Sequence, residues 1–202
     1  MLRLGITGGI ASGKSVVAEM LRKLGFPVID ADGLGHELME PGTPAFDEIV
    51  REFGGAVVGD SGRIDRGKLG AAAFADAAKL ARLNAILHPR IAEEMARRFA
   101  AWERNGVSPA AFVEAALLVE AGYQEHLDGL IVAWCRPEQQ MERLRARGMS
   151  EEEARRRIAS QLPVGEKLRY ATEKIDCSGT IEETQRQVEV LATKLRGAAE
   201  RK

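Results

Sequence analysis

The sequence is poor in cysteine, has no excess of either charge and contains no long apolar run. Cys135 and Cys177 are the only cysteines in 202 residues, and their spacing matches no metal-binding motif. This shortage excludes a disulfide-rich secreted scaffold and predicts a reducing, cytoplasmic location. Lys plus Arg number 29 and Asp plus Glu number 30, a balance that argues against nucleic-acid and membrane-surface partners. No segment approaches the length of a membrane span, so we expect no membrane partner.

A glycine-rich segment close to the N-terminus carries the clearest chemical signal. Residues 8–15 read GGIASGKS and match the phosphate-binding loop pattern G-x-x-x-x-G-K-[ST]. Glycine lets the backbone pass close to a phosphate, and inward-pointing N–H groups form an anion cradle. Lys14 would supply charge for the β- and γ-phosphates, and the Ser15 hydroxyl would ligate Mg²⁺. The predicted ATP-binding residues in and beside this loop are Gly8, Gly9, Ala11, Ser12, Gly13, Lys14, Ser15 and Val16.

The flanks of this segment agree with a nucleotide site. The apolar residues 2–7 have strand length, and Val17, Met20, Leu21 and Leu24 recur at helical spacing before Gly25. An ordinary glycine-rich turn with an accidental Lys-Ser pair is the alternative, and both flanks count against it. We therefore expect ATP with Mg²⁺ as the cofactor. GTP is disfavoured because the sequence lacks the Asn-Lys-x-Asp motif that recognises guanine.

The rest of the chain alternates short apolar runs with helical patterns, which predicts an α/β fold. Such an alternation favours a parallel sheet covered on both faces, with ligands at the carboxyl ends of the strands. The expected strands are residues 2–7, 27–30, 111–115, 130–135 and, more weakly, 173–176.

One connection is much longer than a crossover requires. Residues 33–109 show no convincing sheet strand and read as several helices, with a Thr43-Pro44 start signal and a turn at residues 60–62. His88-Pro89 predicts a break between two of these helices, because proline disfavours a helical conformation in the residue before it. Long inserts at this edge of a sheet are usually functional, so we interpret residues 33–109 as a substrate-binding subdomain.

An arginine-rich helical hairpin over residues 138–163 has the composition of a closing lid. Gly148 separates its two helices, and Ser150 with Glu153 forms a capping box. Lid arginines reach a transferring phosphoryl group and exclude water. We assign Arg143 a catalytic role and expect both Arg143 and Arg147 to contact ATP. For Arg145, Arg155 and Arg156 a solvated helix face with i,i+4 pairs is the better interpretation.

Carboxylates at two strand ends complete the candidate site. Asp32 follows the second strand and is the candidate catalytic base, with a helix N-cap for residues 33–39 as the alternative. Glu114 ends the third strand and could hold Mg²⁺ directly or through water, or could be a solvated strand-end acid. His88 and Arg90 are candidate substrate contacts, with Arg90 placed at a helix N-terminus after Pro89. Lys14 is the third candidate catalytic residue.

Taken together, these segments resemble the dephospho-CoA kinase family over nearly the whole chain. The resemblance rests on residues 5–15 (GITGGIASGKS), 30–32 (DAD), 62–69 (GRIDRGKL), 87–89 (LHP), 117–120 (LLVE), 139–140 (QQ), Arg143, Arg147 and Gln161. It implies a three-layer P-loop kinase fold with a five-stranded parallel sheet. The implied division is a core of residues 1–32, 110–137 and 164–202, a helical substrate-binding subdomain of residues 33–109 and a lid of residues 138–163. It also implies phosphorylation of the ribose 3′-hydroxyl of dephospho-CoA with Asp32 as base.

The sequence departs from the family pattern at a few positions. Ala11 stands where the family often has glycine, and a small residue there should still let the loop form. Thr172 and Cys177 also differ from the common residues near the fifth strand, where the resemblance implies that the adenine binds. The competing interpretations are another small-molecule kinase, such as one for nucleoside monophosphates, and a nucleotide-dependent switch. The oligomeric state has no signal in the sequence.

Overall fold

The computed structural model describes residues 1–199 and divides into two compact units. The core unit comprises Met1–Asp30 together with the chain from Ala101 onward, and the helical unit comprises Ala31–Ala100. These boundaries differ slightly from the expected ones at residues 32 and 109, and the residues expected to form the lid fall within the core unit. Each unit is described by itself.

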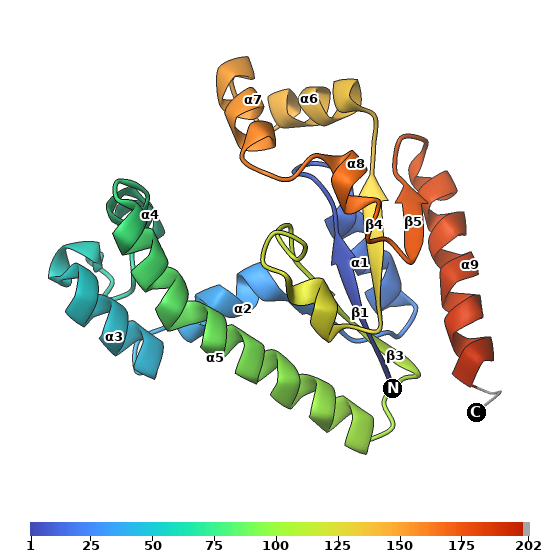
Figure 1. The fold of residues 1–202 in the computed structure, drawn as a ribbon, viewed down its shortest axis with the longest axis horizontal. Helices are drawn as coiled ribbons and strands as arrows, with labels where there is room; N and C mark the ends of the chain where they lie inside the picture. Colours follow the sequence, from blue (N-terminus) through green and yellow to red (C-terminus); the bar gives the residue numbers. More distant parts are fainter. Residues whose placement is uncertain (200–202) are drawn as a thin grey trace. The chain divides into compact units, whose positions relative to one another are not determined.

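The core unit is built on a five-stranded, fully parallel sheet, as the sequence predicted (Figure 1). The order across the sheet is β2-β3-β1-β4-β5. The strands are β1 (Leu2–Thr7), β2 (Val28–Asp30), β3 (Ala110–Glu114), β4 (Gly129–Trp134) and β5 (Glu173–Asp176). Each predicted strand is present, with its ends shifted by at most one residue. The two neighbours of the central strand β1 are β3 and β4, so the chain leaves β1 toward opposite edges of the sheet. In open parallel sheets, ligands bind at the carboxyl ends of the strands where the strand order reverses in this way.

One face of the sheet is covered by α1 (Lys14–Lys23) and α9 (Ile181–Ala199). Leu4 and Ile6 of β1 point toward this face and are buried together with Leu21 of α1 and Val188 and Leu191 of α9. Burying one such aliphatic side chain contributes about 1.5–3 kcal/mol. One face of α1 packs on the sheet, as the helical spacing of its apolar residues predicted. These residues are Val17, Met20, Leu21 and Leu24.

Each parallel strand ends at the same edge of the sheet, and that edge carries the polar segments of the core unit. The loop of residues 8–13 follows β1, and Cys135 and Cys177 directly follow β4 and β5. Three further helices, α6 (Pro137–Ala146), α7 (Glu151–Ala159) and α8 (Val164–Lys167), connect β4 with β5. Gly148 separates α6 and α7, and its φ of 83° is the left-handed conformation that suits glycine at a helix end.

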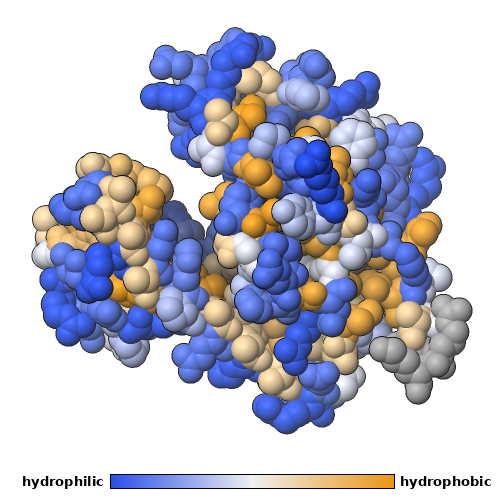
Figure 2. Space-filling model, viewed as in Figure 1, coloured by the Kyte–Doolittle hydropathy of each residue, from blue (hydrophilic) through white to orange (hydrophobic). Residues whose placement is uncertain are grey.

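The hairpin of α6 and α7 carries mainly hydrophilic side chains (Figures 1 and 2). Ser150 accepts a hydrogen bond from the Glu153 N–H at 3.2 Å, as the capping box predicted. The Glu153 carboxylate, however, accepts from Arg157 at 2.8 Å. The expected pair of Glu151 with Arg155 is present at 2.7 Å, and Arg145 contacts the same carboxylate. Arg145 and Arg155 therefore form the solvated, paired surface that was expected for them, whereas Arg156 has no ion pair within residues 1–199.

The helical unit consists almost entirely of helices, which confirms that the long insert adds no strand to the sheet. Its elements are α2 (Ala31–Leu38), α3 (Pro44–Phe53), the short 3₁₀ helix η1 (Gly55–Val57), α4 (Arg66–Phe74) and most of α5 (Ala77–Arg104). Thr43 caps α3 by accepting from the Phe46 N–H at 3.1 Å, and Pro44 is the first helical residue. Buried Ile49, Val57, Leu69 and Ile86 form the centre of this unit.

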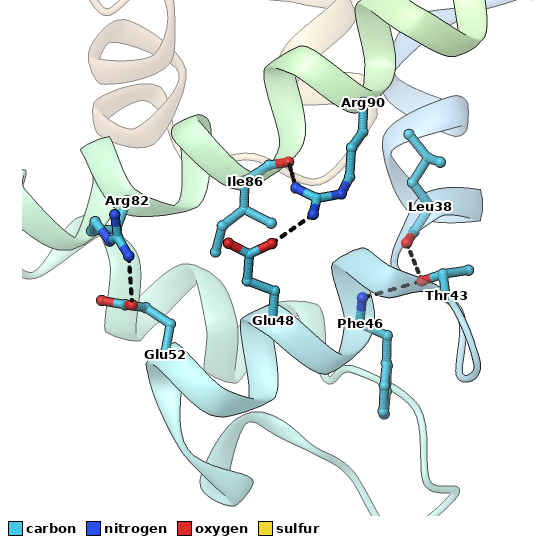
Figure 3. A network of polar contacts seen from close by, with 8 residues as sticks. All are labelled: Leu38, Thr43, Phe46, Glu48, Glu52, Arg82, Ile86 and Arg90. Carbon is cyan, nitrogen blue, oxygen red and sulfur yellow. Dashed lines mark hydrogen bonds and ion pairs between the residues drawn. The ribbon is translucent and has the colours of Figure 1, made fainter.

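The predicted helix break at His88-Pro89 is wrong. The helix α5 runs without interruption from Ala77 to Arg104, with Pro89 inside it. Proline removes the backbone donor that would bond the Ala85 carbonyl, and the Arg90 guanidinium donates to the neighbouring Ile86 carbonyl at 2.6 Å (Figure 3). Packing of Ile86, Met95 and Phe99, all buried on α5, outweighs the local preference of the His-Pro step.

Among residues 1–199, no helix combines the length and the apolar character that crossing a membrane requires.

Candidate active site

The loop of residues 8–13 connects the end of β1 to the start of α1, and its backbone passes close to the backbone of β4 at Ala133. A Cβ atom at Gly8 would lie 2.2 Å from the Ala133 carbonyl oxygen, so only glycine fits there. Gly13 precedes α1 with a φ of 107°, which a residue with a side chain rarely adopts. The first N–H groups of α1 follow directly, which is the arrangement that receives a phosphate in P-loop proteins.

One residue of this loop, Ala11, has a strained backbone conformation, and another, Ser12, has a hydroxyl that is unpaired within residues 1–199. Ala11 has a φ of 58° and is the only non-glycine residue of the described chain with positive φ. The Ser12 hydroxyl is buried, and no hydrogen-bond partner for it exists among the described residues. Buried polar atoms are almost always paired, so an unpaired hydroxyl inside a loop of this type indicates a missing polar ligand.

Lys14 and Ser15 converge on one buried carboxylate. The Ser15 hydroxyl donates to Glu114 Oε1 at 2.6 Å, and Lys14 Nζ lies 3.3 Å from the same oxygen. Arg22 of α1 lies 3.9 Å from the other carboxylate oxygen. Glu114 is only 6 % exposed and ends β3, where its register partner on β1 is Ile6. Its interpretation as a solvated strand-end acid is therefore wrong, because the side chain is buried and paired.

This group of residues fits a magnesium ion by its donor chemistry. Mg²⁺ prefers hard oxygen ligands and is usually held by one or two carboxylates together with substrate phosphates. The Ser15 hydroxyl and the Glu114 carboxylate are such donors and already lie within 2.6 Å of each other. Within residues 1–199 no group of three or more His, Cys, Asp or Glu side chains could hold a metal by itself, so Mg²⁺ here would take its remaining ligands from water or a bound phosphate.

Side chains of the 138–163 segment hold the backbone of the phosphate-binding loop. The Gln140 amide donates to the Ile10 carbonyl at 2.6 Å, and Gln161 accepts from the Ile10 N–H at 2.8 Å. Arg143 donates to the Ala11 carbonyl at 3.2 Å and to the Cys177 carbonyl at 2.7 Å. The two glutamines received no role from their chemistry in the sequence, because a glutamine on a polar helix gives no local signal.

A cavity of about 160 Å³ opens beside the loop. Its lining brings Arg143 and Arg147 together with loop residues and with the segment after β5. Contact of either arginine with ATP stays a prediction. The lining residues are Ala11, Gly13, Val16, Arg143, Arg147, Cys177, Gly179, Ile181 and Thr184. Burial raises the pKa of the Cys177 thiol to about 11, so this wall of the cavity stays uncharged at neutral pH.

A fully buried lysine supports the segment that follows β3. Lys167 Nζ donates to the Ala116 carbonyl at 2.6 Å and forms an ion pair with Glu120 at 2.8 Å. Burial acts to raise the pKa of Glu120, but the Lys167 ammonium and the Leu162 N–H outweigh it and lower that pKa. The hydrogen bond from the Leu162 N–H to Glu120 ties the end of the 138–163 segment to this pair, and sequence reasoning gave Lys167 no role.

Within the helical unit, Asp32 lies in the first turn of α2. The helix begins at Ala31, so the alternative interpretation of Asp32 as an N-cap residue is wrong. Along the chain Asp32 follows the last residue of β2 by two positions, as expected. The catalytic role of this carboxylate stays a prediction.

His88 and Arg90 lie in the middle of α5 rather than at a helix junction. His88 is exposed, and Arg90 pairs with Glu48 of α3 at 2.6 Å while it donates to the Ile86 carbonyl (Figure 3). The expected helix N-terminus at Arg90 does not exist, because α5 runs through this position. A substrate contact by either residue stays a prediction, and for Arg90 it would compete with Glu48.

Comparison with known proteins shows which family this chain is similar to. The dephospho-CoA kinase family model matches residues 2–183. The chain is 46 % identical over 184 residues to a dephospho-CoA kinase of Corynebacterium glutamicum, covering 91 % of this chain and 94 % of the relative. It is also 44 % identical over 189 residues to the dephospho-CoA kinase of Bacillus cereus, covering 93 % of this chain and 94 % of the relative.

Solved structures agree with this result. A Thermus thermophilus protein superimposes with a TM-score of 0.83 at 35 % identity, covering 96 % of this chain and 97 % of the other. Dephospho-CoA kinase from Campylobacter jejuni superimposes with a TM-score of 0.73 at 27 % identity, covering 97 % of this chain and 98 % of the other. A shikimate kinase from Bacteroides thetaiotaomicron, with a TM-score of 0.52 at 14 % identity and coverage of 96 % and 98 %, shares the fold alone. The chain belongs to the dephospho-CoA kinase family.

Proposed function

We propose that this protein transfers the γ-phosphoryl group of ATP to the ribose 3′-hydroxyl of dephospho-CoA, which yields coenzyme A and ADP. The observation that carries this proposal is the convergence of Lys14 and Ser15 on Glu114 beneath a glycine-rich loop, in a chain of this family. The two buried free thiols, Cys135 and Cys177, fit a reducing cytoplasm.

The loop would bind the phosphates of ATP through backbone N–H groups and Lys14. The Ser12 hydroxyl would gain the polar partner that it lacks in the protein alone. Mg²⁺, held by Ser15 and Glu114 together with the nucleotide, would neutralise charge on the β- and γ-phosphates. The purine would occupy the cavity between Arg143 and Ile181, where Val16 and Ile181 offer apolar surface.

Asp32 would act as the general base. Its carboxylate would accept the proton of the 3′-hydroxyl while the oxygen bonds to the γ-phosphorus and the bond from that phosphorus to the bridging oxygen of ADP breaks. Arg143 is held by the Ala11 and Cys177 carbonyls, which would keep its guanidinium beside the loop for charge on the transferring group. Lys14 would balance charge on the same phosphates.

The assignment of Asp32 is tested by the Asp32→Asn variant. We expect kcat to fall by a factor on the order of 10² to 10⁴, because the amide cannot accept the proton. The Kd for ATP should stay within about threefold of the wild-type value, since the loop residues are unchanged. Asp47→Asn is the matched control, because Asp47 occupies the first turn of α3 as Asp32 occupies that of α2. Near-normal turnover of Asp32→Asn would remove Asp32 from the role of base.

The position of transfer is tested with an acceptor analogue. Dephospho-CoA that lacks the 3′-hydroxyl should bind and compete with the normal acceptor but accept no phosphate from ATP. Phosphorylation of this analogue would place the reaction at another hydroxyl and would contradict the proposed function.

A further inference from the structure

The helical unit contains a basic cavity to which the mechanism above gives no role. It measures about 320 Å³ and is lined by His36, Met39, Glu40, Arg63, Ile64 and Arg66. All six residues belong to the helical unit, and three of them come from the GRIDRGKL segment, residues 62–69. A cavity of this volume is in the range that small-molecule ligands occupy.

The charge in this cavity is unbalanced toward the positive sign. Arg66 has no carboxylate partner in the described chain, and its guanidinium contacts the two ring nitrogens of His36 at 3.0 and 3.2 Å. Arg63 has one partner, Glu40, at 3.3 Å, with both side chains largely exposed. An exposed pair of this kind contributes about 0–1 kcal/mol and gives way to a stronger anion.

Other arginines of the same unit differ in this respect. Arg82, Arg90, Arg97 and Arg98 each have a glutamate within 3.2 Å, whereas Arg51 of α3 has no ion pair within residues 1–199 and does not line the cavity. Three of these pairs, those of Arg82, Arg90 and Arg98, join α5 to another helix. Arg66 instead contacts a histidine in the cavity wall and has no carboxylate partner in the described chain, an arrangement that an anionic ligand would complete.

The backbone around these arginines is held in place. Residues 57–65 form a tight hairpin, in which Val58 and Ile64 pair as an antiparallel bridge and the Gly59 N–H donates to the Arg63 carbonyl at 2.9 Å. Asp65 then caps α4 by accepting from the Lys68 N–H at 3.0 Å, so Arg66 is fixed as the first helical residue. A site that is rigid before binding loses less entropy on binding.

The position of His36 relative to Asp32 identifies the group that would bind. Both residues lie on α2 four positions apart, so they share one face with Cβ atoms about 5–6 Å apart. In dephospho-CoA the ribose separates the 3′-hydroxyl from the 5′-diphosphate. The span of a ribose is similar to this separation, so a 3′-hydroxyl at Asp32 is compatible with a diphosphate one helical turn further along α2, beside His36.

We propose that this cavity binds the diphosphate of dephospho-CoA, with Arg66 and Arg63 as its cationic contacts; this inference rests on the proposed function. Arginine suits this task because its planar donors match phosphate oxygens in pairs. The cavity would thereby distinguish dephospho-CoA from acceptors without a diphosphate.

Direct binding measurements test this proposal without any turnover. We expect the Kd of the Arg66→Met variant for dephospho-CoA, measured by calorimetry without ATP, to rise at least tenfold, which corresponds to about 1.4 kcal/mol. Binding of adenosine, which lacks the diphosphate, should be unchanged. The wild-type Kd for dephospho-CoA should weaken with added salt, and this dependence should be smaller in the variant. Arg82→Met is the matched control, because Arg82 pairs with Glu52 outside the cavity.

Kinetic measurements distinguish a failure of the cavity assignment from a failure of the proposed function. If the wild type forms coenzyme A and Arg66→Met shows a raised KM for dephospho-CoA with an unchanged KM for ATP, the assignment is supported. If the wild type forms coenzyme A but Arg66→Met binds dephospho-CoA as tightly as the wild type, the cavity assignment is wrong and the proposed function stands. A wild type that neither binds nor phosphorylates dephospho-CoA would contradict both. An equal loss of adenosine and dephospho-CoA binding in the variant would show a structural effect and would also overturn the assignment.

Discussion

At the scale of single residues, Ala11 is a position of the phosphate-binding loop where a residue with a side chain adopts a backbone conformation that favours glycine. Its φ of 58° lies in the left-handed region, which costs a residue with a Cβ about 1–2 kcal/mol. The sequence predicted that alanine would still permit the loop, and the loop does form. It could not predict the strain, because the composition of a loop does not give the backbone angle at each position.

We expect Ala11→Gly to raise the free energy of unfolding by about 0.5–1 kcal/mol. The gain is smaller than the strain because glycine has more conformational entropy to lose on folding. Thermal unfolding should shift upward by about 1–4 °C. Ala121→Gly, at an exposed turn residue without positive φ, should give no gain. A loss of stability in Ala11→Gly equal to that in Ala121→Gly would show that no strain is stored at this residue.

At the scale of elements, the hairpin of α6 and α7 divides its arginines by their partners. Arg155 pairs with Glu151 on the exposed surface, whereas Arg143 donates to two backbone carbonyls at the phosphate-binding loop. The sequence predicted this division from the one-turn spacing of Arg143 and Arg147. It could not identify the backbone acceptors, because those depend on where β5 and the loop meet in three dimensions.

For this element we expect Arg143→Met to lower kcat/KM for ATP by a factor on the order of 10². Arg155→Met, which removes a charge from the same hairpin, should stay within about twofold of the wild type. Steady-state assays with ATP as the varied substrate compare the two variants. Equal effects of both substitutions would mean that hairpin charge alone, rather than the place of Arg143 beside the loop, matters for activity.

A second element, the long helix α5, contains a carboxylate with a strongly shifted pKa. Hydrogen bonds from Arg97 and Arg98 lower the pKa of Glu94 from 4.5 to about 2 against the opposing effect of burial. Because the folded-state pKa is lower, the ionised carboxylate stabilises the fold above pH 4.5, and this contribution is lost as the pH falls toward 2. Arg98 also pairs with Glu37 of α2 at 2.6 Å, so Glu94 supports the contact between two helices.

We expect Glu94→Gln to lower the free energy of unfolding by about 1 kcal/mol at pH 7, after allowance for solvent screening. The difference from the wild type should shrink as the pH falls from 4.5 toward 2. Urea unfolding at a series of pH values measures it, with Glu93→Gln as control, since Glu93 has no ion pair in the described chain. A difference that is constant with pH would contradict the assigned pKa of Glu94.

At the scale of the whole molecule, the sequence predicted the sheet well and the helical insert less well. Strand positions followed from short apolar runs, because every strand of a buried parallel sheet must be apolar. The break expected at Pro89 failed because the burial of Met95 and Phe99 along α5 outweighs one missing hydrogen bond. The cavity at Arg63 and Arg66 had no signal beyond the family resemblance, because it is formed by segments distant in the chain.

The central claim also concerns the whole molecule, namely that the acceptor is dephospho-CoA. The most direct measurement is kcat/KM with ATP for dephospho-CoA compared with AMP, with the products identified by mass spectrometry. We expect coenzyme A as the product and a preference for dephospho-CoA of at least about 100-fold, because AMP lacks the diphosphate and the group beyond it. Efficient phosphorylation of AMP without formation of coenzyme A would contradict the proposed function.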